Sequence, residues 1–301
     1  MRKFIIDTDP GVDDATSLII AMNNQNFDIK LITTTYGNVD IEKTTKNALF
    51  LVEKFGKDIK VAKGSEKPMK RKQKSAIQVH GKDGLGNFQT STPQSSPLEN
   101  AVYEMYKIIK ENPHEITLVE LGPQTNLGKL FTTYPECESL VKEIIFEGGS
   151  PYGKKGIVPH ISFNISCDPE ATEIVLNTKI KKTIIPSEMG RYVAPFSQEQ
   201  IEKIRKVNNT GKMLYSMYQG YKSDCIKKST ETNDLCTIMY ILYPEIFSTY
   251  NCDIAVDTKE MPGRIFVTEK EDGAITFVEN VDKEKFFELF IENLKKINLT
   301  F

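Results

Sequence analysis

The stretch of sequence that decides the fold reads Phe4-Ile5-Ile6-Asp7-Thr8-Asp9-Pro10-Gly11-Val12-Asp13-Asp14. A short apolar run leads directly into acids, and apolar residues between 18 and 22 then fit a helix from about Asp13 to Asn24. Residues 29–35 are rich in β-branched side chains and end before Gly37-Asn38. A strand, a helix and a second strand in this order predict a βαβ unit.

The next part of the chain continues this alternation. Further strands are expected at 59–62, 116–119, 144–146 and 183–185, and helices at 41–55, 98–111 and 168–177. Strands that alternate with helices favour an α/β fold with a mainly parallel, Rossmann-like sheet flanked by helices on both faces. Ligands of such sheets bind beyond the carboxyl ends of the strands.

The last third has a different character. Helices are expected at 199–206, 210–222, 234–242 and 282–296, which gives the fold a helical C-terminal part. The runs Arg264–Thr268 and Ala274–Val278 flank Glu271-Asp272-Gly273 and predict a small β-hairpin. No linker or internal repeat divides the sequence, so we expect a single domain over residues 1–301. The stretch 64–97 is rich in lysine, serine, glycine and proline, which predicts a long solvated loop of the kind that often forms a lid.

The composition limits the class of partner. A formal charge of −2, from 39 basic and 41 acidic residues, argues against a protein that binds nucleic acid. No run approaches the roughly 20 apolar residues that a membrane-spanning helix needs, and the N-terminus lacks the apolar segment of a secretory signal. The five cysteines are widely spaced without a CxxC pair, which favours reduced thiols over disulfides or a zinc site. We therefore expect a cytoplasmic protein that does not bind membranes.

Four carboxylates lie close together at Asp7, Asp9, Asp13 and Asp14. One or two acids at the start of a helix are ordinary, because aspartate caps helix N-termini. Four would repel each other and raise each other's pKa unless a cation neutralises them. The available donors are all oxygens, which suits Ca²⁺ or Mg²⁺. The turn at Pro10-Gly11 folds the two acidic pairs toward one point.

Two kinds of hydrolysis fit this acidic cluster. Mg²⁺-dependent phosphatases of the haloacid dehalogenase type also carry an Asp-x-Asp pair after the first strand. This chain has Pro10-Gly11 where they carry Thr or Val, and it shows no convincing later lysine or second acidic pair. The other chemistry is hydrolysis of an N-glycosidic bond by a water that a divalent cation activates. Neighbouring negative oxygens would then stabilise the positive charge that develops on the sugar.

Six segments of the chain are similar, in the same order, to the inosine-uridine-preferring nucleoside hydrolases. The chain resembles that family at Asp7–Ala15, Tyr36–Val39, His80–Gly86, Leu121–Leu127, Phe163-Asn164 with Asp168–Ala171, and Asn233-Asp234. Each match is weak alone, and their shared order makes the resemblance specific. It implies Ca²⁺-dependent hydrolysis of a ribonucleoside to ribose and a nucleobase, in purine or pyrimidine salvage, by a homodimer or homotetramer.

The resemblance also implies a role for each matching residue. Ca²⁺ would be held by Asp9, Asp14, Asp234 and the backbone carbonyl of Thr125, and Asp9 would also take a proton from the attacking water. Ribose hydroxyls would bind Asp13, Asn38 and Asn164. His80 would contact the substrate, or it could simply satisfy its hydrogen bonds within a loop.

Three positions depart from the family's pattern. Ser162 and Gly156 stand where the family has a Glu and an Asn that bind the 5′ end of the ribose, and Asn233 stands for a His often assigned to the leaving group. We expect Ser162 to line an enlarged 5′ pocket, so that 5′-deoxy or 5′-substituted ribosides are accepted relatively better than in typical members.

The site residue Asn233 has no proton to transfer. Another acid could serve the leaving group, with His80 or a tyrosine at 215, 218 or 221 as candidates, or the substrate needs none. A calcium-bound ribose- or nucleoside-binding relative without turnover is the alternative to an enzyme. The retained Asp9 favours the enzyme.

Overall fold

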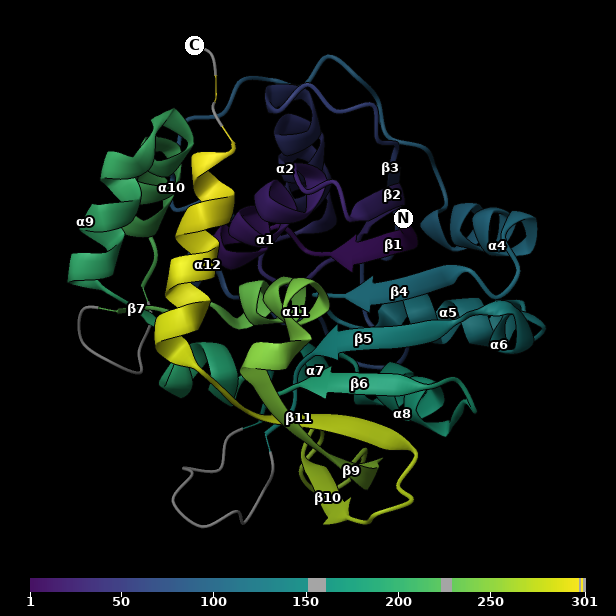
Figure 1. Ribbon diagram of the computed structural model, residues 1–301. Coiled ribbons are helices and arrows are strands. Elements are labelled where there is room, and N and C mark those ends of the chain that lie inside the picture. The colour runs from purple at the N-terminus through teal and green to yellow at the C-terminus, as the bar shows by residue number, and fades with distance from the viewer. Residues whose placement is uncertain (151–160, 223–228, 298, 300–301) are drawn as a thin grey trace.

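The computed structural model describes residues 1–150, 161–222, 229–297 and 299. Within them a sheet of nine strands, in the order β10-β9-β11-β6-β5-β4-β1-β2-β3, forms the middle layer (Figure 1). Neighbouring strands from β3 to β11 along this order are parallel, whereas β9 is antiparallel to both β11 and β10. The strands are β1 (Arg2–Thr8), β2 (Phe27–Thr34), β3 (Val61–Lys63), β4 (Ile116–Glu120), β5 (Glu143–Glu147), β6 (Lys182–Ile185), β9 (Phe247–Val256), β10 (Ile265–Glu269) and β11 (Ile275–Val281).

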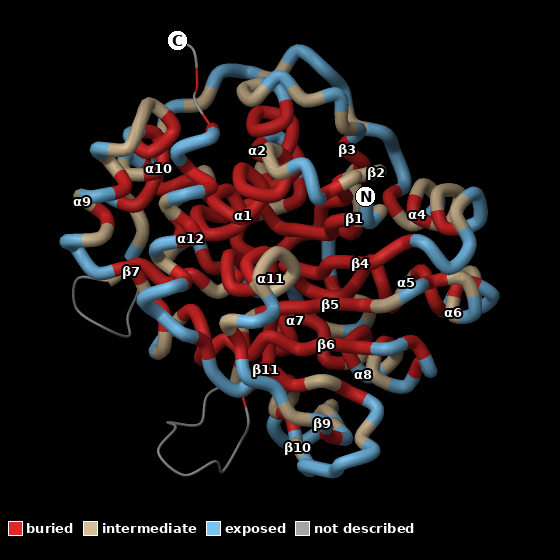
Figure 2. The backbone as a smooth tube through the Cα atoms, viewed as in Figure 1, coloured by how far each residue is buried: buried red, intermediate tan, exposed pale blue. Residues whose placement is uncertain are grey.

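Helices cover both faces of the sheet because successive side chains of a strand point to opposite faces. In β1, Phe4 and Ile6 belong to one core and Ile5 to the other. Helices α1 (Val12–Met22), α2 (Ile41–Lys54), α9 (Gln198–Val207), α10 (Asn209–Gln219), α11 (Asn233–Leu242) and α12 (Lys283–Lys295) enclose the first core. Helices α4 (Ala101–Glu111), α5 (Thr125–Thr133), α6 (Cys137–Leu140) and α8 (Pro169–Asn177) enclose the second. Figure 2 shows the buried strands between these layers, and the predicted α/β fold class is confirmed.

The predicted hairpin between 264–268 and 274–278 is wrong in its pairing. Both runs are strands, β10 and β11, but β9 lies between them in the sheet and pairs with each (Figure 1). The turn at Glu271-Asp272-Gly273 therefore crosses over β9, and a Cβ placed on Gly273 would lie 2.5 Å from the backbone nitrogen of Cys252. The hairpin of consecutive strands is β9 with β10. The sequence did not predict β9.

The stretch 64–97 runs as a long connection with the short helix α3 (Ile77–His80) in its middle. Its basic part is mostly exposed, whereas His80 and Leu85 are buried. A second short helix, α7 (Phe163–Cys167), precedes α8, and β7 (Phe196–Ser197) pairs with β8 (Ser229–Thr230) apart from the main sheet. No described helix is long and apolar enough to cross a membrane. Four cysteines are buried free thiols, and Cys225 lies outside the described residues.

Candidate active site

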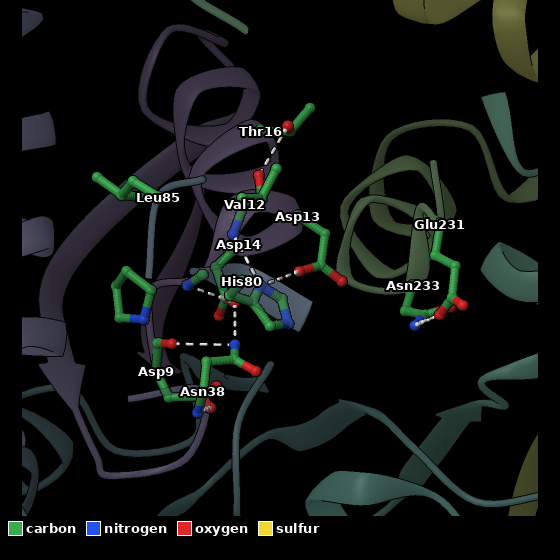
Figure 3. A network of polar contacts seen from close by, with 12 residues as sticks. Asp9, Val12, Asp13, Asp14, Thr16, Asn38, His80, Leu85, Glu231 and Asn233 are labelled. Atoms are coloured by element: carbon green, nitrogen blue, oxygen red, sulfur yellow. Dashed lines mark hydrogen bonds and ion pairs between the residues drawn. The ribbon is translucent and has the colours of Figure 1, made fainter. Parts of the chain in front are cut away.

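The acidic cluster lies where β1 gives way to α1. Asp9 follows β1, and Asp13 and Asp14 belong to the first turn of α1. Asn38, which follows the neighbouring strand β2, joins them: its backbone N–H donates to Asp9 Oδ2 at 2.6 Å and its Nδ2 to Asp14 Oδ2 at 2.9 Å (Figure 3). These residues meet because the carboxyl ends of adjacent parallel strands share one edge of the sheet.

The side chain of Asp14 is held by the start of its own helix. The Gly11 N–H donates to Asp14 Oδ2 at 2.9 Å, and the Thr8 hydroxyl donates to Oδ1 at 2.5 Å. Gly11 also leaves room for its neighbours, since a Cβ at this position would lie 2.4 Å from Nδ1 of His80 and 2.6 Å from Nδ2 of Asn38. The turn predicted from Pro10-Gly11 thus brings the acids, Asn38 and His80 together.

Three buried carboxylates converge from the two halves of the chain. One ligand oxygen each of Asp13, Asp14 and Asp234 lies within 4.8 Å of the other two. Asp234 comes from the first turn of α11, which packs against α1. Burial first, and then the neighbouring carboxylates, raise the pKa of Asp9, Asp13 and Asp234 well above the ordinary value for aspartate. The pKa of Asp14 is raised by the same burial.

These side chains fit a divalent cation. Oδ1 of Asp9 and Oδ1 of Asp13 are buried, and neither is hydrogen-bonded within the described part of the chain. Unpaired buried charge is costly, and a hard cation with oxygen ligands would offset that cost. The tight trio contains Asp13, for which the resemblance implied a ribose contact, and not Asp9, for which it implied a metal contact.

A second pair of acids lies beneath the cluster. Asp7 of β1 is the register partner of Glu120 on β4, so the two buried acids are neighbours in the sheet. Thr33 and Asn126 donate to Asp7. Burial raises the pKa of Asp7 to about 6, and burial together with the neighbouring Asp7 raises the pKa of Glu120 well above its usual value. The sequence included Asp7 among the acids but gave no sign of Glu120.

A cavity of about 210 Å³ opens beside the aspartates. Six residues predicted from the sequence line it, and these are Asp13, Asn38, His80, Asn164, Asn233 and Asp234. Five further polar residues that sequence reasoning did not assign to the site also line it, and these are Gln78, Glu147, Ser187, Arg191 and Glu231. The segment Ala76–His80 forms part of the wall, which agrees with a functional role for the long connection.

His80 is a neutral hydrogen-bonding residue at the cavity wall. Its Nδ1 accepts from the Val12 N–H at 3.1 Å and lies 3.8 Å from Asp13 Oδ1. Burial lowers the pKa of His80 to about 3. An imidazole that accepts at Nδ1 carries its proton on Nε2, so His80 can donate a hydrogen bond but is not a proton donor near neutral pH. Tyr221 packs edge-on against its ring, with 5.2 Å between the centroids.

Asn233 forms the opposite side of the cavity, together with Glu231 (Figure 3). Its Nδ2 donates to Glu231 Oε2 at 3.1 Å. The Asn233 Oδ1 is buried and, among the described residues, accepts no hydrogen bond. Nε of Arg191 lies 3.8 Å from Glu231 Oε1. Arg191 belongs to the π-helical turn Met189–Val193, and such turns are frequent at functional sites.

Of the three tyrosines considered from the sequence, Tyr221 reaches the cavity. Tyr218 is buried in the core, where its hydroxyl lies 2.9 Å from Thr16 Oγ1. Tyr215 packs against that core, and a hydrogen bond with Glu202 raises its pKa. Neither Tyr215 nor Tyr218 lines the cavity.

Four predicted site residues are not among those that line the cavity, and these are Asp9, Asp14, Thr125 and Ser162. The Ser162 hydroxyl is buried, and nothing in the described ranges hydrogen-bonds to it. Thr125 begins α5 just after β4, and its hydroxyl donates to Asp168 Oδ2 at 2.7 Å. Gly156 lies outside the described residues.

Comparison with known proteins agrees with this geometry. The family model described as inosine-uridine preferring nucleoside hydrolase matches residues 4–288. The chain belongs to this nucleoside hydrolase family. The enzyme hydrolyses the N-glycosidic bond of ribonucleosides, and its membership of this family excludes the haloacid dehalogenase type of phosphatase.

Individual relatives support the same conclusion. The nucleoside hydrolase is 35% identical over 256 residues to the non-specific ribonucleoside hydrolase RihC of Salmonella newport (strain SL254), across 85% of this chain and 83% of the relative. Its structure is similar to that of the plant nucleoside hydrolase PpNRh1, with a TM-score of 0.89, 27% identity and coverage of 98% and 99%. The purine-preferring ribonucleoside hydrolase from Gardnerella vaginalis, at 22% identity and a TM-score of 0.90 over 98% and 99%, shares the fold.

Proposed function

We propose that the enzyme depends on Ca²⁺ and that Asp9, Asp14, Asp234 and the carbonyl of Thr125 hold the ion. The observation that carries this proposal is the convergence of buried carboxylates from α1 and α11 beside the cavity. A donor set made of oxygens alone favours Ca²⁺ over a softer metal. When bound, the ion would lower the pKa of the attacking water and orient the ribose hydroxyls.

Asp9 is proposed as the general base. The Asn38 N–H occupies its Oδ2, while Oδ1 is buried without a hydrogen bond to any described residue. That oxygen is available to take a proton from water. The pKa of Asp9 is raised by burial and by Asp14, which makes it a stronger base than an exposed aspartate.

The ribose is proposed to bind Asp13, Asn38 and Asn164. Both amide hydrogens of Asn38 are already used, since Nδ2 donates to the Asp9 carbonyl at 3.1 Å and to Asp14 at 2.9 Å. Its Oδ1 therefore remains to accept from a sugar hydroxyl. The cavity-facing carboxylate of Asp13 is likewise an acceptor. A polyol, which brings several donors, suits this lining.

The leaving base is proposed to lie toward Asn233, Glu231 and Tyr221. On this side Asn233 cannot give up a proton and His80 is neutral. The Arg191 guanidinium lines the same cavity and can hydrogen-bond to negative charge on a departing base without transferring a proton. The arrangement therefore favours bases that leave readily.

Metal removal tests the calcium proposal. Nucleoside hydrolysis should be lost after dialysis against a calcium chelator and restored by Ca²⁺. Calorimetric titration should give one ion per chain, and Asp234→Asn should weaken that binding at least tenfold. Full turnover by protein that elemental analysis finds free of metal would contradict the proposal. If Mg²⁺ restores activity and Ca²⁺ does not, the ion is Mg²⁺ and not Ca²⁺.

We also propose a cytoplasmic enzyme that assembles as a homodimer or homotetramer. The support is the family resemblance, together with the absence of an apolar spanning helix in the described part of the chain. Light scattering after gel filtration gives the mass of the assembly, and a mass equal to the 34.1 kDa chain would exclude both oligomers.

A further inference from the structure

Glu147 is a buried carboxylate of the cavity wall to which no role has been given so far. It is the last residue of β5, and its side chain is 4% exposed. The Ser187 hydroxyl donates to Oε1 at 2.6 Å, and Nδ2 of Asn164 donates to Oε2 at 2.9 Å. Each oxygen is thus positioned by one donor. A carboxylate oxygen has two lone pairs, so both oxygens keep the capacity to accept a further bond.

The neighbours of Glu147 make this side of the cavity rich in acceptors. Asn164 uses both amide hydrogens, one for Glu147 and one for the Leu121 carbonyl at 2.7 Å. Its Oδ1 is therefore the atom left for a ligand. Ser187 has used its hydroxyl hydrogen on Glu147. A group that binds here must bring its own hydrogen, as a sugar hydroxyl does.

The sheet sets the distance between Glu147 and the acidic cluster. β5 and β1 are separated by β4, so their carboxyl ends lie two strand spacings apart, roughly 9–10 Å. A ribose whose 2′- and 3′-hydroxyls face Asp13 and Asp14 would direct its opposite end across β4 toward β5. That end carries the 5′-hydroxyl.

Glu147 also lies beside the position that lost its acid. A Cβ placed on the next residue, Gly148, would be 3.2 Å from the Ser162 hydroxyl. Position 162 therefore lies next to the residue that follows Glu147 at the end of β5.

We propose that Glu147 accepts a hydrogen bond from the 5′-hydroxyl of the ribose and determines the preference for substrates that carry it. The proposal rests on the function proposed above. It replaces the expectation, drawn from Ser162 and Gly156, that the enzyme tolerates 5′-deoxy ribosides. The small residue at 162 then reflects a carboxylate moved to another element of the fold.

The test combines two substrates with two substitutions. For the parent enzyme, kcat/KM should be about 10–100-fold higher for inosine than for 5′-deoxyinosine, the range expected for a hydrogen bond to a charged group. Glu147→Leu should lower kcat/KM for inosine by a similar factor and leave 5′-deoxyinosine within about threefold, which removes the preference. Glu143→Gln, at the opposite end of β5 where Glu143 pairs with Arg2, is the control and should keep the preference.

Each outcome discriminates. Equal kcat/KM values for the two nucleosides in the parent enzyme would overturn the proposal. An equal loss for both substrates in Glu147→Leu would also overturn it, since that pattern means Glu147 acts through Asn164 or through folding. If calcium-loaded parent enzyme hydrolyses neither nucleoside, the proposed function fails, and the same comparison is made on dissociation constants by calorimetry. Tighter binding of inosine than of 5′-deoxyinosine by the parent, lost in Glu147→Leu, would still support the contact. Identical dissociation constants of the parent for the two nucleosides would refute it.

Discussion

Asp9 combines a carboxylate oxygen held by Asn38 with one that lies in the interior without a described hydrogen-bond donor. Asp9→Asn should keep the fold and lower kcat by about 10²–10⁴-fold, because the amide accepts no proton and contributes no charge to the cluster. Steady-state kinetics with inosine measure the loss, and Asp28→Asn on β2 is a control of the same chemistry outside the site. Activity within a few-fold of the parent would remove Asp9 from the catalytic role.

Asn233 predicts a dependence on the leaving group. p-Nitrophenyl riboside should be cleaved far better than inosine, because its leaving group needs no protonation. Neither Asn233 nor the neutral His80 of the cavity wall can give a proton to the base of inosine. Asn233→His should narrow the gap by raising inosine turnover. Comparable rates for the two substrates in the parent enzyme would mean that another acid is present.

At the level of single residues, short motifs identified part of the site. The other residues of the cavity wall come together only in the folded chain. Asp13, Asn38, Asn164 and Asp234 were predicted from short matches and do line one cavity. Glu147 was missed because one acid at the end of a short strand looks ordinary. The usable signal was its position, since the carboxyl ends of buried parallel strands are where ligands bind.

Among the elements, hydrophobic periodicity predicted the alternating strands and helices well. The longest elements that the sequence did not predict are helix α5 and strand β9, in which Tyr250, Cys252 and Ile254 alternate with polar residues. Without β9, the two strands on either side of the Asp272-Gly273 turn were paired with each other. Turn residues show where the chain reverses, but they do not show whether another strand lies in between.

Helix α5 carries Thr125 and packs closely on α8. A Cβ on Gly128 of α5 would lie 2.8 Å from Cβ of Ala171 on α8. Gly128→Ala should therefore lower the free energy of unfolding by about 1–3 kcal/mol, as overpacking does. At an uncrowded helix position the same change stabilises by about 0.5–1 kcal/mol. The sign of the change in unfolding free energy, measured by urea unfolding, therefore shows whether position 128 is overpacked. An unchanged or higher midpoint would show that the two helices can separate without cost.

The whole molecule should become less stable as pH rises when calcium is absent. Burial raises the pKa of Asp7 to about 6 and of Glu147 to about 7, from ordinary values of 3.8 and 4.5. The folded state then binds more protons than the unfolded chain, so this stabilisation is complete at low pH and is lost as pH rises from about 4 to about 7. The urea concentration at the unfolding midpoint, measured in the presence of chelator, should therefore decrease as the pH is raised from about 5.5 to about 7.5.

Calcium supplies the control for that pH dependence. The proposed ion would favour the ionised cluster, so the stabilisation by added calcium should grow over the same pH interval. Glu147→Gln should flatten part of the slope in chelator, since the amide does not titrate. If the urea midpoint of the protein in chelator instead increases as the pH is raised toward 7.5, the buried acids do not dominate the pH dependence of stability.

The place of β11 in the sheet has a consequence for biosynthesis. β11 is the last strand in the sequence, yet it lies between β6 and β9. While a ribosome is still translating the segment before residue 275, the nascent chain holds β6 with an open edge and has no partner for the inner side of β9. Sheet closure, and with it the burial of the first core by α12, must wait until residues 275–295 have been translated. An arrested chain of this enzyme would therefore be a client for chaperones, however complete its acidic cluster already is.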